Sequence, residues 1–328
     1  MNLASIYEPI KHEMQQMSDS LTAIISDSTD PRIREITAVV QTTSGKMLRP
    51  ALTLLSSKIA SPHELPEHQP NLISLALSME LIHLASIVHD DVIDNTLSRR
   101  GQPSANALLG NNVSILLGDY LYSKALQHIA KCHHSEIFIH VCDAIHDMCE
   151  GELEQVNRRD CWDMSEKDYI AIISKKTAAL FSISCRVGVL LGRSGSEIEI
   201  VLRDFGLHLG IAYQIADDCR DVLLEEDGLG KTPYQDLMAG DVTLPLLNIR
   251  KAANTAQRVD IENAYRTQIG GTCVDTLRGF AEATDALRAS RDIALKHIKL
   301  ARNRLSRLTD SVYRRSLSGL TDYIEKSL

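Results

Sequence analysis

The chain has 328 residues and a formal net charge of −8, and 44% of its residues are hydrophobic while only 4% are aromatic. The hydrophobic share supports a sizeable core, although length alone does not distinguish one large domain from two ordinary ones. The acidic balance and the shortage of aromatic side chains argue against a nucleic-acid partner, which requires basic surfaces and stacking platforms. A small phosphorylated ligand is not excluded, because it needs only a local basic patch.

Helical periodicity dominates the chain from one end to the other. Four long and largely apolar segments are predicted as helices, and they begin at Leu72, Val113, Asp168 and Glu197. Shorter amphipathic helices are predicted from about Val259 onward. Alternating β-branched runs between turn residues are missing, so we expect few or no strands.

Short breaker segments separate these helices, at residues 61–70, 99–104, 192–196, 228–233 and 269–271. None is long enough to link two domains, and the chain has no repeat or low-complexity segment. We therefore predict a single all-α domain over residues 1–328. Segments that are apolar nearly all round, 72–88 and 176–191, are expected at the centre of a helical bundle.

Cysteine usage and the N-terminal sequence indicate the compartment. Seven cysteines without a CxxC pair are typical of a reducing environment rather than of a disulfide framework. The first 17 residues lack a basic stretch followed by an apolar run, so we expect no signal peptide. No uninterrupted apolar run of about 18 residues occurs, so we expect no transmembrane helix. These features predict a soluble, cytoplasmic protein.

Two DDxxD motifs each follow an apolar helical run. Their carboxylates are Asp90, Asp91 and Asp94 in the first motif and Asp217, Asp218 and Asp221 in the second. Positions i and i+4 share a helix face, so the outer carboxylates of a motif repel each other unless a cation lies between them. Mg²⁺ prefers oxygen ligands and commonly keeps phosphate oxygens in its shell. One such motif is usually solvated surface, but two on buried helices predict a metal–diphosphate site.

Basic side chains near these motifs are candidates for diphosphate binding: Lys46, Arg49, Arg99, Arg100, Lys175, Lys176 and Lys231. Arginine binds phosphate oxygens with two parallel hydrogen bonds, whereas lysine acts as a point charge. Taken singly, most of these residues are interpreted as solvated surface charges. Lys176 is the exception, because its neighbours are apolar and a buried lysine is unfavourable without a partner.

Six motifs in order resemble those of the trans-isoprenyl diphosphate synthases, also called polyprenyl synthetases. They are GKMLRP (45–50), the aspartate-rich segment from Glu80 to Pro103, KTAALF (176–181), YQIADDCRD (213–221), GLGKT (228–232) and DLMAGDVTLP (236–245). The resemblance runs from about residue 44 to 250. It implies an isoprenoid synthase fold of roughly 10–13 helices around a central substrate cavity. It also implies a homodimer, with a heteromer left open because some relatives pair with a regulatory subunit.

The implied activity is head-to-tail condensation of isopentenyl diphosphate onto an allylic diphosphate, such as farnesyl or geranyl diphosphate. Two or three Mg²⁺ ions would stabilise the leaving diphosphate, so that the allylic C–O bond ionises. The double bond of isopentenyl diphosphate, held in its own site, would then attack the carbocation. This chemistry needs no covalent enzyme intermediate.

The resemblance implies a role for each matching residue. Asp90 and Asp94 resemble the ligands of two Mg²⁺ ions, and Asp217 resembles the ligand of a third. The carboxylates that would support them are Asp91, Asp218 and Asp221. The residues that would bind the allylic diphosphate or line the reacting centre are Arg99, Lys176, Thr177, Gln214 and Lys231. Those that would bind isopentenyl diphosphate are Lys46, Arg49, His83 and Arg100.

Product length is predicted from the helix turn before Asp90. Relatives that stop at farnesyl carry bulky aromatics there, whereas Ala85 and Ser86 are small, with the apolar Ile82 beyond them. A long all-trans product of C30 to C50 is therefore predicted, with geranylgeranyl diphosphate (C20) as the alternative. One residue departs from the family pattern: Asp241 stands where many relatives have lysine, which puts a third allylic lysine in doubt.

Rival enzyme classes leave part of this pattern unused. A histidine–aspartate metal phosphohydrolase would use His83 and the pair His89–Asp90, but the second DDxxD would then have no purpose. A terpene cyclase would use both acidic motifs but not the predicted isopentenyl site. A regulatory subunit of a heteromer would have lost its aspartates, and both motifs are intact here.

Two further patterns are interpreted as ordinary sequence. The GKT at 230–232 resembles a P-loop, but Glu225 stands where the first glycine is required. Histidines and cysteines between His128 and Cys149 are interpreted as ordinary helical residues near a loop at 133–135 rather than as a zinc site.

Overall fold

The computed structural model describes residues 2–27, 29–43, 45–61, 69–99, 101–192, 195–223, 239–267, 279–280 and 285–328. In this part of the chain, thirteen α-helices have eight or more residues. Extended structure among the described residues amounts to one antiparallel hairpin, in which β1 (Ser98–Arg99) pairs with β2 (Gln102–Pro103). The predicted all-α class is confirmed, and the hairpin lies in one of the predicted breaker segments.

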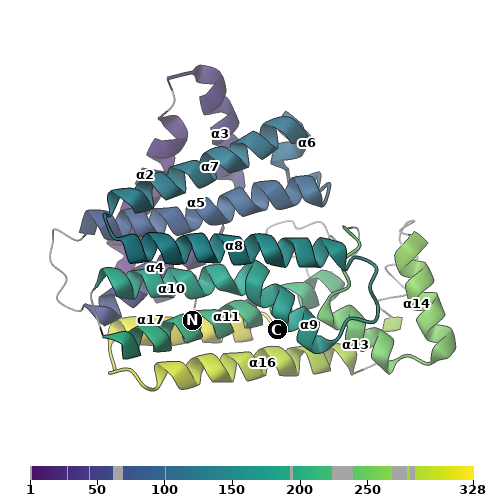
Figure 1. The fold of residues 1–328 in the computed structure, drawn as a ribbon. Helices are drawn as coiled ribbons and strands as arrows, with labels where there is room; N and C mark the ends of the chain where they lie inside the picture. The colour runs from purple at the N-terminus through teal and green to yellow at the C-terminus, as the bar shows by residue number, and fades with distance from the viewer. Residues whose placement is uncertain are drawn as a thin grey trace.

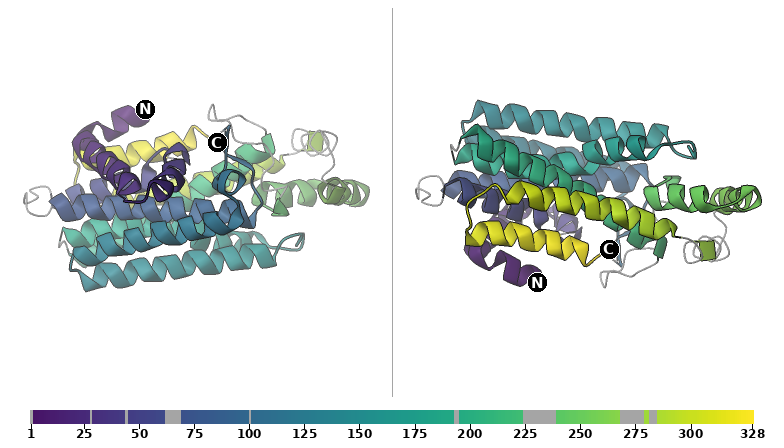
Figure 2. Two further views of the ribbon diagram at one scale, coloured as in Figure 1. Left: turned by 90° about the horizontal axis from the view of Figure 1, so that it is seen from above. Right: turned by 90° about the horizontal axis from the view of Figure 1, so that it is seen from below.

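The helices follow one another along the chain with short connections. Those of the N-terminal half are α1 (Leu3–Tyr7), the 3₁₀ turn η1 (Glu8–Ile10), α2 (Lys11–Ser26), α3 (Pro31–Thr43), α4 (Leu48–Ala60), α5 (Gln69–Ile93), α6 (Ala105–Leu109), α7 (Asn111–Lys131) and α8 (Ser135–Asn157). Those of the C-terminal half are α9 (Glu166–Ile173), the π-helical segment η3 (Ser174–Ala178), α10 (Ala179–Leu191), α11 (Ser196–Leu223), α13 (Leu244–Ala252), α14 (Thr255–Thr267), α16 (Ala286–Leu305) and α17 (Val312–Glu325). Figures 1 and 2 show the long helices α5, α7, α8, α10, α11 and α16 lying roughly along one direction.

Helix α5 forms the centre of the bundle because it is apolar on nearly every face. It packs against α4, α7 and α10, and Leu72, Leu75, Leu81 and Leu84 are fully buried there. By length and composition α5 could cross a membrane, but 78% of its most apolar window is buried inside the fold. This burial agrees with the predicted central position of segment 72–88.

The C-terminal helices are longer than the sequence pattern predicted. α16 has 20 residues and packs along α11. Its buried residues recur every one to four positions and form one continuous stripe: Ala286, Leu287, Ser290, Ala294, Ile298, Ala301 and Leu305. Several of these side chains are small, which allows the two helices to approach closely.

Two helices carry the acidic motifs to the same end of the bundle (Figure 1). Asp90 and Asp91 lie in the last turn of α5, and Asp94 follows its final residue, Ile93. The second motif occupies the last two turns of α11, which ends at Leu223. The C-terminal end of a helix disfavours negative charge, so both motifs require cations close by.

Candidate active site

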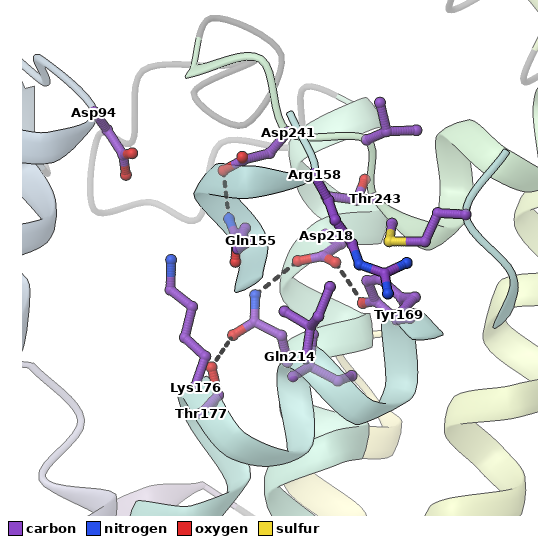
Figure 3. Close-up of a pocket in the computed structure, with 14 residues that line it drawn as sticks. Asp94, Gln155, Arg158, Tyr169, Lys176, Thr177, Gln214, Asp218, Asp241 and Thr243 are labelled. Atoms are coloured by element: carbon purple, nitrogen blue, oxygen red, sulfur yellow. Dashed lines mark hydrogen bonds between the residues drawn. The ribbon is translucent and has the colours of Figure 1, made fainter. Parts of the chain in front are cut away.

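A cavity of about 470 Å³ lies between α5, α7, α8, η3 and α11. Nine residues predicted from the sequence line it: Arg49, His83, Ser86, Asp90, Asp94, Lys176, Thr177, Gln214 and Asp217. A smaller pocket of about 90 Å³ shares Asp94, Lys176, Thr177 and Gln214 with this cavity and adds Asp218 and Asp241. Figure 3 shows Asp94 and Lys176 pointing toward the same space from different elements. The fold thus brings together residues that are more than a hundred positions apart in the chain.

Two of the three predicted metal-binding carboxylates are paired with arginines in this structure. Asp217 Oδ1 accepts a hydrogen bond of 2.8 Å from Arg220 Nη2, and Asp94 Oδ1 accepts one from Arg159 Nη2. Within the described ranges, no group of three or more histidine, cysteine, aspartate or glutamate side chains is arranged so that it could hold a metal ion. The donor set nevertheless suits Mg²⁺, because Asp90, Asp94 and Asp217 are hard oxygen donors on two walls of one cavity.

Of the three supporting carboxylates, Asp91 and Asp218 are buried and Asp221 is half-buried. Asp91 is buried, and its carbonyl oxygen accepts hydrogen bonds from Thr96 N at 2.9 Å and Asn106 Nδ2 at 3.1 Å. These bonds fasten the segment that follows α5. Asp218 is buried as well, and burial raises the pKa of its carboxyl to about 7, with Asp217 and Asp221 adding to the rise.

A chain of hydrogen bonds orients the amide of Gln214 (Figure 3). Thr177 Oγ1 donates to Gln214 Oε1 at 2.8 Å, and Gln214 Nε2 donates to Asp218 Oδ1 at 2.7 Å. The Tyr169 hydroxyl donates to the other Asp218 oxygen at 2.5 Å. The two hydrogen bonds favour the charged form of Asp218 and oppose the effect of its burial. Thr177 and Gln214, both predicted at the reacting centre, are therefore directly connected.

Lys176 lies on η3, the π-helical segment between α9 and α10. Such single π-turns are frequent at functional sites because they redirect side chains within a helix. Its Nζ lies 2.5 Å from Glu152 Oε2. Burial alone would lower the pKa of Lys176, but the negative charges of Asp90, Glu152 and Asp94 outweigh it and the pKa is raised. Lys176 is therefore a fixed positive charge that faces the first acidic motif.

Arg49, from the predicted isopentenyl site, lies on α4 and lines the same cavity. Its side chain is only 8% exposed, and its guanidinium lies 4.8 Å from the centroid of the Phe181 ring. Burial lowers the pKa of Arg49, and the buried carboxylate of Glu80 opposes this effect. Glu80 is thus a charge partner of Arg49 that the motif reasoning missed. A signal was present, since Glu80 is the only acidic residue between Leu72 and Val88.

The two ends of the chain meet beside Lys46. The Tyr7 hydroxyl donates to the Lys46 carbonyl oxygen at 2.7 Å, and Lys46 Nζ lies 5.5 Å from the centroid of the Tyr323 ring. Lys46 itself is not among the residues that line the cavity. Tyr7 and Tyr323 carried no motif that would have predicted this contact.

Three predicted phosphate ligands lie outside the described residues in whole or in part. Arg100 and Lys231 are outside the described ranges, and only the backbone of Arg99 is described, as part of β1. Their predicted roles remain predictions.

The predicted chain-length residues lie on different faces of α5. Ser86 lines the cavity, whereas Ala85 and Ile82 are fully buried in the hydrophobic core and do not line it. At 100° per residue, Ser86 points about 40° from the direction of Asp90, Ile82 about 80° and Ala85 about 140°. Ala85 therefore does not border the cavity in this structure, and its expected effect on the path of the growing tail stays a prediction. Tyr122 of α7 and Met148 of α8 line the cavity as well.

Asp241, the departure from the family pattern, is buried and has two partners. Its carboxylate accepts a hydrogen bond from Gln155 Nε2 and another, of 3.3 Å, from Arg159 Nε. Burial raises the pKa of Asp241, while Lys176, Gln155 and Arg159 act in the opposite direction. A cation thus accompanies the acid at this position.

Comparison with known proteins places these features in a family. Residues 30–278 match the family model described as "Polyprenyl synthetase". The chain is 30% identical over 320 residues to a short chain isoprenyl diphosphate synthase from Methanothermobacter thermautotrophicus, covering 96% of this chain and 97% of the relative. It is 29% identical over 320 residues to an octaprenyl diphosphate synthase from Haemophilus influenzae, covering 98% of this chain and 95% of the relative.

Solved structures agree with the sequence matches. A decaprenyl diphosphate synthase from Rhodobacter capsulatus superposes with a TM-score of 0.90 at 29% identity, covering 99% of both chains. A polyprenyl synthase from Caulobacter crescentus, complexed with calcium and isoprenyl diphosphate, gives a TM-score of 0.90 at 27% identity over 99% of this chain and 97% of that one. As its ordered motifs predict, the chain belongs to the polyprenyl synthetase family.

Proposed function

We propose that this chain is a trans-prenyltransferase that condenses isopentenyl diphosphate head-to-tail onto an allylic diphosphate, farnesyl or geranyl diphosphate. One observation carries the proposal: both acidic motifs line a single cavity together with Arg49, His83 and Lys176. Several carboxylates around one cavity require cations to balance their charge. The basic residues Arg49 and Lys176 line the cavity from different elements, α4 and η3. The arrangement suits two diphosphates, one bound through metal and one bound by the protein directly.

The allylic side is built around Lys176. Mg²⁺ held by Asp90, Asp94 and Asp217 would supply electrostatic stabilisation for the departing diphosphate. Lys176 adds a fixed positive charge on the same side, and its ion pair with Glu152 holds the ammonium in place. The Thr177–Gln214–Asp218 chain keeps the amide of Gln214 in one orientation beside the reacting carbons. These groups are arranged before the substrate enters, which is what electrostatic catalysis requires.

The isopentenyl side is built around Arg49. Its planar guanidinium suits phosphate oxygens, and the Phe181 ring and Glu80 hold it within the wall. His83 lines the same cavity. A binding site here would place the double bond of isopentenyl diphosphate next to the allylic carbon, and the released diphosphate would accept the proton that is lost. This second site favours a condensing enzyme over a terpene cyclase.

We further propose a long product of C30 to C50. Support comes from the small side chain of Ser86 in the cavity wall and from long-chain relatives, such as the octaprenyl and decaprenyl diphosphate synthases. Geranylgeranyl diphosphate is the second candidate, because the bulkier side chains of Tyr122 and Met148 line the same cavity from α7 and α8. Incubation with isopentenyl diphosphate, farnesyl diphosphate and Mg²⁺, followed by chain-length analysis, distinguishes the two.

A cytoplasmic homodimer is part of the same proposal. Its support is a set of large apolar side chains left exposed on α7 and α8 outside the cavity, namely Leu116, Phe138 and Ile139. Exposed apolar residues that gather on adjacent helices are typical of a protein–protein interface. Light scattering of the purified protein measures the assembly directly.

The decisive test removes a carboxylate of the cavity. Asp217→Ala should lower turnover about 100- to 1000-fold, because leaving-group stabilisation is lost. The matched control is Asp163→Ala, since the Asp163 side chain is 94% exposed and lies outside the cavity. Removal of metal with EDTA should abolish turnover, and Mg²⁺ should restore it. Near-normal product formation by the Asp217 variant at saturating Mg²⁺ would contradict the proposal.

A further inference from the structure

Asp241 is a carboxylate at the rim of the site that the reaction as described does not use. Only 4% of the residue is exposed, and a buried carboxylate is unfavourable unless it is paired. It lines the smaller pocket together with Asp94 and Lys176 (Figure 3). The negative charge of Asp241 alone would repel a diphosphate. The cationic partner of Asp241 therefore determines whether the smaller pocket can bind an anion.

That partner is Arg159, which joins two acidic residues. Its Nε donates to Asp241 Oδ1 at 3.3 Å, and its Nη2 donates to Asp94 Oδ1. Gln155 Nε2 donates to the other oxygen of Asp241. A guanidinium has five N–H donors in a rigid plane, so these two contacts leave it able to bind further oxygens.

Backbone contacts connect the segment after α8, which contains Arg159, to the segment before α13, which contains Asp241. Asp160 N donates to the Gly240 carbonyl oxygen at 3.1 Å. Gly240 has φ +90°, and a Cβ at this position would lie 3.6–3.7 Å from the Arg159 side-chain carbons. The stem of Arg159 therefore packs over a glycine whose backbone conformation other residues rarely adopt. The positions of Arg159 and Asp241 are therefore fixed by the packing and backbone contacts around them.

We infer that Arg159 is a further ligand of the allylic diphosphate and that Asp241 is the residue that positions it. This inference rests on the proposed function. Asp94 lines the cavity where divalent cations are expected, and a cation at Asp94 would compete for the oxygen that now accepts from Arg159 Nη2. Phosphate oxygens bound to the same cation are then the natural acceptors for this donor. Arg159 Nε would keep its hydrogen bond to Asp241, so the guanidinium would stay in place while its Nη atoms donate to the substrate.

The first experiment measures binding of inorganic diphosphate, in the presence of Mg²⁺, by titration calorimetry. Arg159→Gln should weaken binding about 10- to 100-fold, the loss expected for a charge-assisted hydrogen bond. Arg186→Gln is the matched control: it removes the same charge from a comparably buried ion pair, with Glu199 at 2.7 Å, and Arg186 lines neither pocket. The control should stay within about twofold of the wild type.

Steady-state kinetics test the positioning role of Asp241. Asp241→Asn should raise the KM for the allylic substrate about five- to tenfold and leave the KM for isopentenyl diphosphate unchanged. The double variant Arg159→Gln with Asp241→Lys returns one positive charge to the same place, and it should regain most of the diphosphate affinity. If Arg159→Gln does not fold because Asp241 loses its partner, Arg159→Gln with Asp241→Asn removes both charges and should show the same weakened binding.

Several outcomes would overturn the inference. Equal diphosphate affinities for the Arg186 and Arg159 variants would show that Arg159 does not touch the ligand. Tighter Mg²⁺ binding with unchanged diphosphate affinity in Arg159→Gln would show that Arg159 only competes for Asp94. A wild type that makes no prenyl product would remove the proposed function and this inference with it. A wild type that makes product while Arg159→Gln matches the control would remove this inference alone.

Discussion

Replacement of Gly151 by alanine tests how closely α8 must approach the π-helical segment that carries Lys176. A Cβ at position 151 would lie 2.5 Å from the backbone nitrogen of Lys176 and 2.9 Å from its Cα. These are backbone atoms of a packed turn, so no flexible side-chain end can move aside. The two segments must therefore separate.

The size of the effect follows from these distances. An ordinary contact of about 3.5 Å requires α8 and η3 to move apart by about 1 Å. Overpacking of this kind costs about 1–3 kcal/mol, and the higher helix propensity of alanine offsets about 1 kcal/mol. The free energy of unfolding should fall by only about 0–2 kcal/mol, which leaves the protein folded. The same displacement moves Lys176 relative to Asp90 and Asp94, and a misplacement of about 1 Å lowers turnover up to about 100-fold.

The assay compares kcat/KM with the melting temperature. Gly151→Ala should lose 30- to 100-fold in kcat/KM, a loss of the order expected for misplaced catalytic groups, while melting only a few degrees lower. Gly195→Ala is the control, because a Cβ at that position has no neighbour within 4 Å. Wild-type turnover by Gly151→Ala, with equal or higher stability, would show that the α8–η3 contact accommodates a methyl group, and it would refute the reasoning.

Three further predictions follow from the partners of the site. Glu80→Gln should raise the KM for isopentenyl diphosphate about tenfold without changing that for the allylic substrate, because Arg49 loses its charge partner; equal changes in both KM values would contradict this. Ser86→Phe should shorten the product while the first condensation continues, whereas Ala85→Phe should mainly lower the melting temperature, since Ala85 is in the core; mass spectrometry of the products and thermal unfolding separate the two. Burial, with the charges of His208 and Lys296, lowers the pKa of His297 to about 4, below the value of about 6.5 in the unfolded chain. Stability should therefore be complete above pH 6.5 and fall as the pH drops toward 4, and the loss should be smaller in His297→Gln; parallel curves would refute the assignment.

The acidic motifs show what the sequence by itself determined. Each DDxxD follows an apolar helical run, and its meaning depends only on spacing within one helix. Their order along the chain, together with the other motifs, was enough to predict the family and nine of the residues that line the cavity, and helical periodicity predicted the all-α class. These features are local, because helix periodicity and motif spacing involve residues a few positions apart.

Tertiary structure alone decided the partners and the directions of side chains. The charge of Glu80 acts on Arg49, and Glu152 and Asp241 form ion pairs with Lys176 and Arg159, across separations that no spacing rule covers. Ser86 and Ala85 are neighbours with equally small side chains, yet only Ser86 reaches the cavity. The physical reason is that each helix turns 100° per residue, and its rotation in the bundle is set by the packing of all its faces. A single helix carries its own pattern, but the face that meets a ligand is chosen by the neighbours against which the other faces are buried.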